Sequence, residues 1–196
     1  MKLLSKVLTL VLSYFVILLI VDSCNPCKNY KYDIDKISLK NLVYSIKRDT
    51  FAVKETDTTV FKYSQFGIRI KFHDVIYSYI NYGLTNTAMA VDCFPAYVLQ
   101  HNIESISVST LGNFDPNHTA NSDVSSYFKS IYLPNQFHSI DSILDVKNGI
   151  KYYLFHEFDL LLDKAPQLDS LFRFIVKVKL SNNELVDTTE MIKLLK

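Results

Sequence analysis

Apolar and polar residues alternate along three stretches of this chain. Residues 66–72 read Phe-Gly-Ile-Arg-Ile-Lys-Phe, and residues 172–180 read Phe-Arg-Phe-Ile-Val-Lys-Val-Lys-Leu. Residues 150–160 follow the same period, although their second face is also partly apolar. Because successive side chains of a β-strand point to opposite sides of the sheet, the alternation predicts three strands, each with one face in a core.

Two turn sequences predict hairpins. Asn148-Gly149 lies between residues 143–147 and 150–158, and Asn-Gly is the strongest short hairpin signal because both residues accept a positive φ. Residues 181–184 separate the strand at 172–180 from residues 185–189. Weaker strand patterns cover residues 37–47, 58–63, 87–93, 97–101 and 103–110, and Pro95 should break or border the strand around it.

One short helix is predicted after residue 121. Asn121 or Ser122 can cap it, and it should end before Pro134. Its apolar positions follow helical spacing: Val124, Tyr127, Phe128 and Ile131. Many short strands, hairpin turns and one short helix favour a mainly β fold, an antiparallel β-sandwich. A partly open β-barrel is the alternative.

The first 24 residues have the pattern of an export signal. Lys2 and Lys6 make the start basic, and residues 7–21 form a nearly continuous apolar run. This run is shorter than the roughly 20 residues that a membrane-spanning helix needs, and it matches the apolar region of a cleaved signal peptide. Val21-Asp22-Ser23-Cys24 closes it and resembles a bacterial lipobox, although Asp22 departs from the small or apolar residue usual there.

The lipobox resemblance implies that Cys24 is lipidated and that the residues before it are removed. We therefore expect a signal peptide at residues 1–23, a polar tether at 24–36 and a single domain at 37–196. Two or three acyl chains anchor a protein stably, so the lipidated Cys24 would hold the chain on a membrane of the cell envelope. Asn25 follows Cys24. The best-known sorting rule has Asp at this position in lipoproteins that stay in the inner membrane, so Asn25 favours the outer membrane. The face of that membrane stays open. An uncleaved anchor, or an ordinary signal peptide with Cys24 as a bystander, is the alternative.

The charge balance argues against nucleic acid as a partner. The chain has 21 Lys and Arg against 20 Asp and Glu, and no basic run. A nearly neutral chain lacks the electrostatic footprint that phosphate backbones select. Two further cysteines, Cys27 and Cys93, could form a disulfide in an oxidising compartment. The alternative is two separate thiols.

No metal or cofactor site is predicted. The five histidines have no ligand spacing among themselves, and H-E-x-x-H fails after His156-Glu157 because position 160 is Leu. Oxygen-bearing side chains alternate over residues 115–123 as in a calcium loop. Ala120 then replaces the turn glycine and Ser126 the bidentate Glu, which favours a polar loop instead.

Three functional hypotheses follow, and an enzyme is not favoured. The first is a binding or accessory module for an unknown protein or glycan ligand. The second is an envelope hydrolase whose site combines His156, Glu157 and Asp159 with other carboxylates in one pocket. The third is a structural subunit with a contiguous exposed apolar or tyrosine patch. The tyrosines that could form a stacking face are Tyr77, Tyr79, Tyr82, Tyr152 and Tyr153.

Several segments together resemble an uncharacterised family of Bacteroidetes-type cell-envelope lipoproteins. They are the lipobox, Ile103–Val108, Phe114–Pro116, Asn121–Val124 with Tyr127-Phe128, and the closing strand pair at 171–180 and 185–194. The resemblance implies a β-sandwich envelope lipoprotein. It implies no activity, and Cys24 is the only functional residue that it supplies.

Overall fold

The computed structural model describes residues 11–14, 29–47, 50–80, 96–133, 136–148 and 156–195. Their secondary structure is mainly β. The strands are β1 (Asn29–Lys47), β2 (Thr50–Glu55), β3 (Val60–Lys62), β4 (Phe66–Ile80), β5 (Ala96–Leu99), β6 (Ile103–Thr110), β7 (Phe128–Leu133), β8 (Gln136–His138), β9 (Glu157–Leu162), β10 (Leu171–Phe172), β11 (Phe174–Leu180), β12 (Glu184–Thr188) and β13 (Ile192–Leu195). The α-helix is α2 (Ile140–Asn148), and residues 11–14 form one helical turn. Two further turns are 3-10 helices: η1 (Tyr63–Gln65) and η3 (Ser125–Tyr127).

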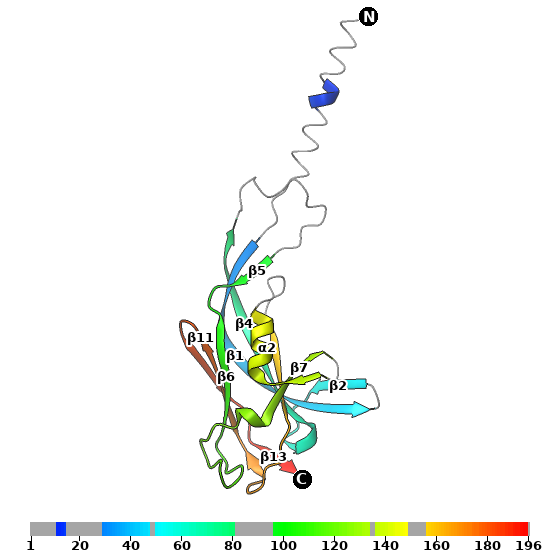
Figure 1. Ribbon diagram of the computed structural model, residues 1–196, viewed down its shortest axis with the longest axis vertical. Coiled ribbons are helices and arrows are strands. Elements are labelled where there is room, and N and C mark those ends of the chain that lie inside the picture. Colours follow the sequence, from blue (N-terminus) through cyan, green and yellow to red (C-terminus); the bar gives the residue numbers. More distant parts are fainter. Residues whose placement is uncertain are drawn as a thin grey trace, which may run out of the picture.

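The described strands form three sheets (Figure 1). The large sheet has the order β2-β1-β4-β9-β7-β8, and β5 runs parallel to the start of β1. The second sheet has the order β12-β11-β6 and is antiparallel throughout. The end sheet has the order β10-β13-β3, in which β13 and β3 are parallel. This arrangement confirms the mainly β, antiparallel sandwich that the alternation predicts.

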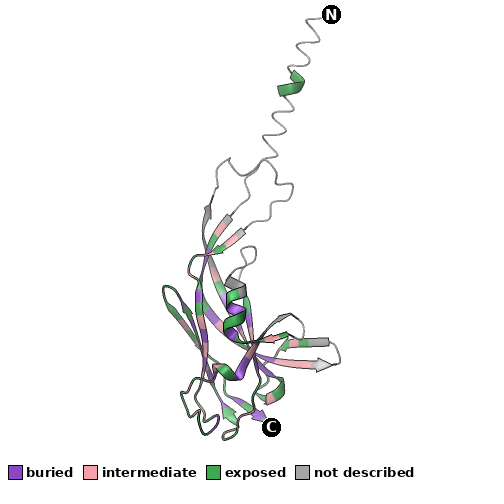
Figure 2. Ribbon diagram, in the orientation of Figure 1, coloured by how far each residue is buried: buried purple, intermediate pink, exposed green. Residues whose placement is uncertain are grey.

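The core lies between the large sheet and the second sheet. Phe66 of β4 stacks on Phe174 of β11 with ring centroids 5.8 Å apart, and Phe128 of β7 meets the same ring edge-on at 5.4 Å. All three side chains are buried, and Figure 2 shows buried positions along the strands of both layers. Aromatic pairs at this spacing add to the free energy gained from burying their surface. The alternating Phe residues of two distant strands therefore join the layers of the sandwich.

The strand predictions at residues 66–72 and 172–180 are confirmed. Phe66, Ile68, Ile70 and Phe72 are all buried in β4, and the buried residues of β10 and β11 begin with Phe172. Residues 103–110 form β6 as expected, and residues 181–184 turn between β11 and β12. The predicted strand at 87–93 and Pro95 lie outside the described residues.

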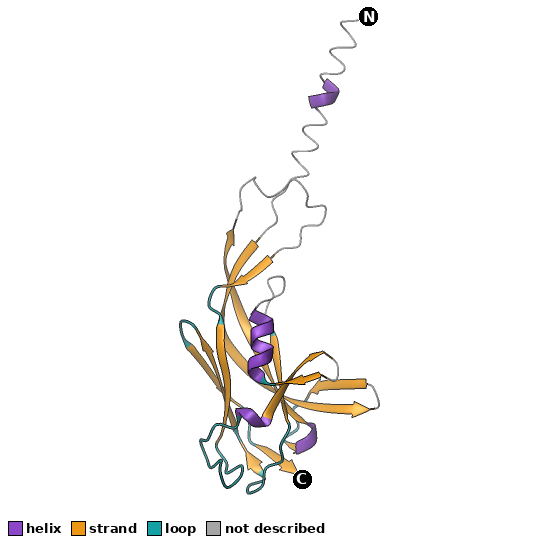
Figure 3. Ribbon diagram, viewed as in Figure 1, coloured by secondary structure: helices purple, strands orange, loops and turns teal. Residues whose placement is uncertain are grey.

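The hairpin predicted at Asn148-Gly149 is wrong, because the residues before it form the helix α2 (Figure 3). Ile140, Ile143 and Leu144 lie at helical spacing and are all buried. The Ser139 hydroxyl accepts the backbone N–H of Ser142 at 3.4 Å, as a helix-capping residue does. A capped apolar stripe therefore outweighs the turn preference of the Asn-Gly pair.

The helix predicted after residue 121 is also wrong, because only the 3-10 turn η3 forms there. The Val124 N–H binds the Val108 carbonyl at 2.8 Å, which holds the preceding segment against the edge of β6. Phe128 then starts β7 and pairs with Leu162 of β9. Sheet pairing on both sides therefore overrides the helical spacing of the apolar residues.

The tether predicted at residues 24–36 is wrong from residue 29 onward. Residues 29–36 form the first part of β1, where Tyr32 pairs with Ile76 of β4. Tyr32 and Ile34 are buried, so this polar-looking segment is part of the domain. Within the described part of the chain, no helix is long and apolar enough to span a bilayer.

Candidate functional site

A cleft of about 530 Å³ lies where the two layers of the sandwich meet. Its residues come from β6, the segment around η3, the start of β7 and the first turn of α2. The floor is apolar and consists of the buried side chains of Ile106, Phe128 and Ile140. We call this site the seam cleft. Its volume falls within the range of about 300–1,000 Å³ that is typical of small-molecule sites.

The rim of the seam cleft is polar and carries two carboxylates without an ion-pair partner among the described residues. Asp123 and Asp141 are both exposed, and neither forms an ion pair with another described residue. Lys129 also lines the cleft, but its Nζ lies 2.8 Å from the Asp163 carboxylate. The remaining described lining residues are serines: Ser125, Ser126 and Ser139. The rim therefore offers negative charge and hydroxyl groups above an apolar floor.

Local hydrogen bonds fix the rim. Asp123 Oδ1 accepts the Ser125 N–H at 2.7 Å, and Ser125 Oγ accepts the Val108 N–H at 2.7 Å. On the other side, Ser139 caps α2 and its Oγ lies 2.8 Å from Ser142 Oγ. The segment around η3 and the first turn of α2 are therefore held in place without a ligand. This preorganisation lowers the entropic cost of binding.

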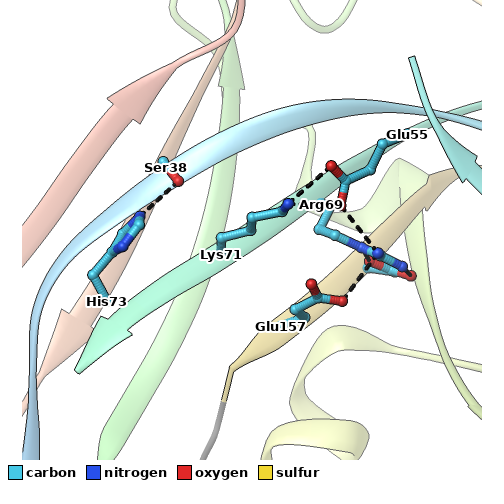
Figure 4. Close-up of polar contacts among 7 residues, drawn as sticks. Ser38, Glu55, Arg69, Lys71, His73 and Glu157 are labelled. Carbon is cyan, nitrogen blue, oxygen red and sulfur yellow. Dashed lines mark hydrogen bonds and ion pairs between the residues drawn. The ribbon is translucent and has the colours of Figure 1, made fainter.

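The carboxylates proposed for a hydrolase are engaged in ion pairs on the outer face of the large sheet (Figure 4). Arg69 of β4 holds Asp159 through two hydrogen bonds, Nε–Oδ1 at 2.7 Å and Nη2–Oδ2 at 2.8 Å. Arg69 Nη1 also lies 3.0 Å from Glu157 and 3.2 Å from Glu55. Lys71 binds Glu55 at 2.8 Å. We call this set the Arg69 cluster.

The electrostatics of the Arg69 cluster are those of a structural ion-pair network. The hydrogen bonds that Arg69 donates to Asp159 raise the pKa of Arg69, so the guanidinium stays charged. The hydrogen bond from Lys71 lowers the pKa of Glu55. His156 is exposed, and its Nδ1 lies 3.7 Å from Asp74. Among the described residues, it forms no ion pair with Glu157 or Asp159. His156, Glu157 and Asp159 therefore do not converge as a general acid–base site would require.

A serine and a histidine meet on the same outer face. Ser38 Oγ of β1 lies 2.9 Å from His73 Nε2 of β4 (Figure 4). Among the described residues, no carboxylate is paired with His73 to orient its ring. Nucleophilic catalysis by serine needs such an oriented base. This pair is therefore a cross-strand hydrogen bond on the sheet surface.

The loop predicted to resemble a calcium site is held by its first carboxylate. Asp115 Oδ1 accepts the backbone N–H groups of Asn117 and His118 and faces His118 Nδ1, each at 2.9 Å. Asp115 Oδ2 accepts the Tyr127 hydroxyl at 2.7 Å. The Tyr127 hydrogen bond is the largest cause that lowers the pKa of Asp115 to about 2. Asp115 is therefore a structural anion, and we call this set the Asp115 network.

The other predicted positions give no second site. Within the described part of the chain, no group of three His, Cys, Asp or Glu side chains could hold a metal ion. A second aspartate–histidine contact joins Asp33 Oδ2 and His101 Nδ1 at 2.6 Å. The cysteines of the lipidation and disulfide predictions lie outside the described residues: Cys24, Cys27 and Cys93. The side chains of Tyr77 and Tyr79, and all of Tyr82, Tyr152 and Tyr153, also lie outside them.

The sequence pattern does not predict the seam cleft: it places Asp123 only in a polar loop, and the hairpin that it predicts at Asn148-Gly149 hides the helix that Ser139 caps and that carries Ile140 and Asp141. The signal was present in the capping serine Ser139 and in the i, i+3, i+4 spacing of Ile140, Ile143 and Leu144. Comparison with known proteins adds no identity. No family model matches the chain, and no curated protein and no solved structure is significantly similar to it.

Proposed function

We propose that this protein is a lipid-anchored cell-envelope binding module that takes its ligand in the seam cleft. The observation that carries the proposal is the cleft itself, a concave site with an apolar floor and two unpaired carboxylates on its rim. The anchor is the acylated Cys24 of the lipobox, and the outer membrane is its favoured location. This function agrees with the envelope lipoprotein family that the sequence resembles.

The chemistry of the cleft selects a class of ligand. Ile106, Phe128 and Ile140 would cover an aliphatic or aromatic group, and Asp123 and Asp141 would pair with a cation beside it. A peptide segment with an apolar residue next to Lys or Arg carries both groups. Opposite charges also steer the encounter, because complementary potentials raise association rates. We therefore propose a protein segment, and not a glycan, as the ligand of this site.

Matched peptides test the proposal in the full chain held in detergent micelles. The probes are the acetylated tripeptide amides Lys-Leu-Lys and Glu-Leu-Glu, titrated against the 15N-labelled protein. We expect the basic peptide to shift the backbone amides of Ser126 and Asp141, and the acidic peptide to leave them unchanged. Equal shifts from both peptides, or none from either, would contradict the proposed ligand class.

A cleft-filling variant provides the control. Ser126 is an exposed lining residue, so Ser126→Trp should fill the mouth of the cleft without disturbing the core. Ser181 is an exposed serine in the turn between β11 and β12, and Ser181→Trp is the matched variant. Ser126→Trp should abolish the shifts caused by the basic peptide, whereas Ser181→Trp should preserve them. Binding that survives in Ser126→Trp would place the peptide elsewhere.

A further inference from the structure

The outward face of the end sheet combines exposed apolar side chains with exposed cations. Leu171 of β10 lies opposite Lys193 of β13, and Lys193 lies beside Val60 of β3 in the parallel pair. On the next row, Leu195 lies beside Lys62. Leu171 is 56% exposed and Val60 is 48% exposed. Apolar and basic positions therefore alternate across the three strands of one face, which we call the basic-apolar face.

The face extends over the adjoining chain. A hollow of about 190 Å³ is lined by Leu111, Leu171, Arg173 and Met191. Leu111 and Met191 are 43% and 49% exposed. Two acidic residues adjoin the hollow: Glu190 lines a different cavity together with Lys40, and Asp169 Oδ2 accepts the Asn113 N–H at 2.6 Å. Exposed apolar side chains that gather in this way mark a contact surface.

The cations of the face are available to a partner. Lys62, Arg173 and Lys193 are all exposed. Among the described residues, none of the three forms an ion pair, whereas Arg69, Lys71, Lys129, Lys177 and Lys179 all do. The face therefore carries three uncompensated positive charges in a chain whose net charge is only +1. Its electrostatic complement is an anionic surface.

The end sheet lies at the opposite end of the domain from the first residues of β1 and from β5 (Figure 1). β1 begins at Asn29, a short distance along the chain from Cys24. An anchor at Cys24 would therefore attach at one end of the domain, and the end sheet with its basic-apolar face lies at the other end.

The composition of the face favours a lipid surface over a protein. The cores of protein interfaces are enriched in aromatic residues, Met and Arg and are depleted in Lys. The described residues of this face include no aromatic side chain, and two of its three cations are lysines. Leucine, methionine and valine can enter the interfacial layer of a bilayer, while lysine stems lie along them and place the ammonium group among the headgroups.

We propose that the basic-apolar face is a second membrane-contact surface, which binds anionic phospholipid headgroups through Lys62, Arg173 and Lys193. Leu171 and its apolar neighbours enter the interfacial layer between the headgroups. With Cys24 acylated at the far end, the protein contacts two bilayers that face each other. The lipid contact itself depends on neither the seam cleft nor the acylation.

Single tryptophan reporters test this contact, because the natural chain contains no Trp. Leu171→Trp places the reporter on the basic-apolar face. Val186→Trp is the matched control, since Val186 is 52% exposed on a strand of the second sheet. Each full-chain variant is reconstituted in phosphatidylcholine vesicles. It is then mixed with separate vesicles of brominated phosphatidylcholine, with or without phosphatidylglycerol.

We expect the Leu171→Trp emission to shift to shorter wavelength and to be quenched only when phosphatidylglycerol is present. Val186→Trp should not respond, and added salt should reverse the effect because it screens the attraction. Replacing Lys62 or Lys193 by Gln in the reporter chain should weaken partitioning by about fivefold each, since one basic residue near an anionic surface contributes about that factor.

Three results would overturn the proposal. Leu171→Trp could fail to respond to the anionic vesicles, or Val186→Trp could respond equally. The Leu171→Trp emission could also be at short wavelength before the vesicles are added, which would show that a second copy or another protein covers the face. None of these results bears on the peptide titration of the seam cleft, so the two proposals fail separately.

Discussion

The carboxylate of Asp115 and the guanidinium of Arg69 each hold a polar network together, one inside the domain and one on its outer face. The Asp115 side chain is 9% exposed and receives hydrogen bonds from four donor groups. The Arg69 side chain is 21% exposed and contacts three carboxylates. In the first network one acceptor serves several donors, whereas in the second several acceptors share one donor group.

This difference predicts unequal dependence on the central residue. A buried donor that loses its acceptor keeps its full desolvation cost, because water cannot replace the partner. A carboxylate at the surface that loses its cation returns to water at little cost. We therefore expect the Asp115 network to determine whether its loop folds, and the Arg69 cluster to adjust the stability of a sheet that folds without it.

The largest effect should follow from Asp115→Ala. This change removes the carboxylate that the Asn117 and His118 N–H groups, the His118 ring and the Tyr127 hydroxyl share. The His118 N–H keeps the Asp115 carbonyl and the Tyr127 hydroxyl keeps its contact with His118 Nδ1, but the loop between β6 and η3 loses the anion that joins these groups. Urea unfolding followed by circular dichroism should show a large fall in the midpoint. Asp159→Ala is the control, because Arg69 keeps Glu55 and Glu157. Equal falls in the two variants would remove the distinction between the networks.

The next effect concerns Gly67, which lies beside Arg69 on the outer face of β4. A Cβ at this position would lie 2.7 Å from Leu161 Cδ2 and 2.8 Å from the Leu160 carbonyl oxygen. Gly67→Ala should therefore cost about 1–3 kcal/mol in the free energy of unfolding, as overpacking does. Ser38→Ala on the same face should cost far less. A neutral Gly67→Ala would show that β4 and β9 separate easily.

Acid should weaken the Asp115 network. The pKa of Asp115 is about 2 in the folded protein against an ordinary value of 3.8, so the folded state binds its proton less readily than the unfolded state does. This contribution to stability is complete above about pH 4 and is lost as the pH falls toward 2. The urea midpoint of the natural chain should fall over that range more steeply than that of Asp115→Asn. Parallel curves would contradict the assignment.

The smallest effect should come from Arg69→Met, which keeps an unbranched apolar stem and removes the guanidinium and its charge. The variant leaves Asp159, Glu157 and Glu55 near one another without the shared cation. We expect a loss of about 1 kcal/mol, because exposed ion pairs contribute little. High salt should reduce the difference from the natural chain by screening. A loss as large as that of Asp115→Ala would mean that the outer face is part of the folding core.

The parts of the fold that the sequence predicts are those with a local signal. The alternation in residues 66–72 and 172–180 marks a buried face directly, and residues 181–184 turn between strands that are neighbours in the chain. The same reasoning misses α2, because Asn148-Gly149 is a strong turn pair wherever it occurs. It also misses β1 before residue 37, where Tyr32 and Ile34 are buried by pairing with the far half of β4.

The sites were harder to predict because their residues meet only in the folded chain. Arg69 binds Glu55, 14 residues away, and Asp159, 90 residues away, so no spacing along the sequence indicates the cluster. The seam cleft needs β6, η3, β7 and α2 in place at once. Residues 115–123 form a polar loop, in which Asp115 Oδ1 accepts an N–H of its own loop and Oδ2 accepts the Tyr127 hydroxyl.

The proposed anchor at Cys24 would decide where the proposed binding module works, and one measurement tests it directly. It is the intact mass of the protein recovered from the membrane fraction of its native host, beside that of a Cys24→Ala variant. We predict a mass equal to residues 24–196 plus acyl groups, and its loss in the variant. A mass without acyl groups, or one that retains residues 1–23, would contradict the lipid anchor and with it the proposed place of this protein in the envelope.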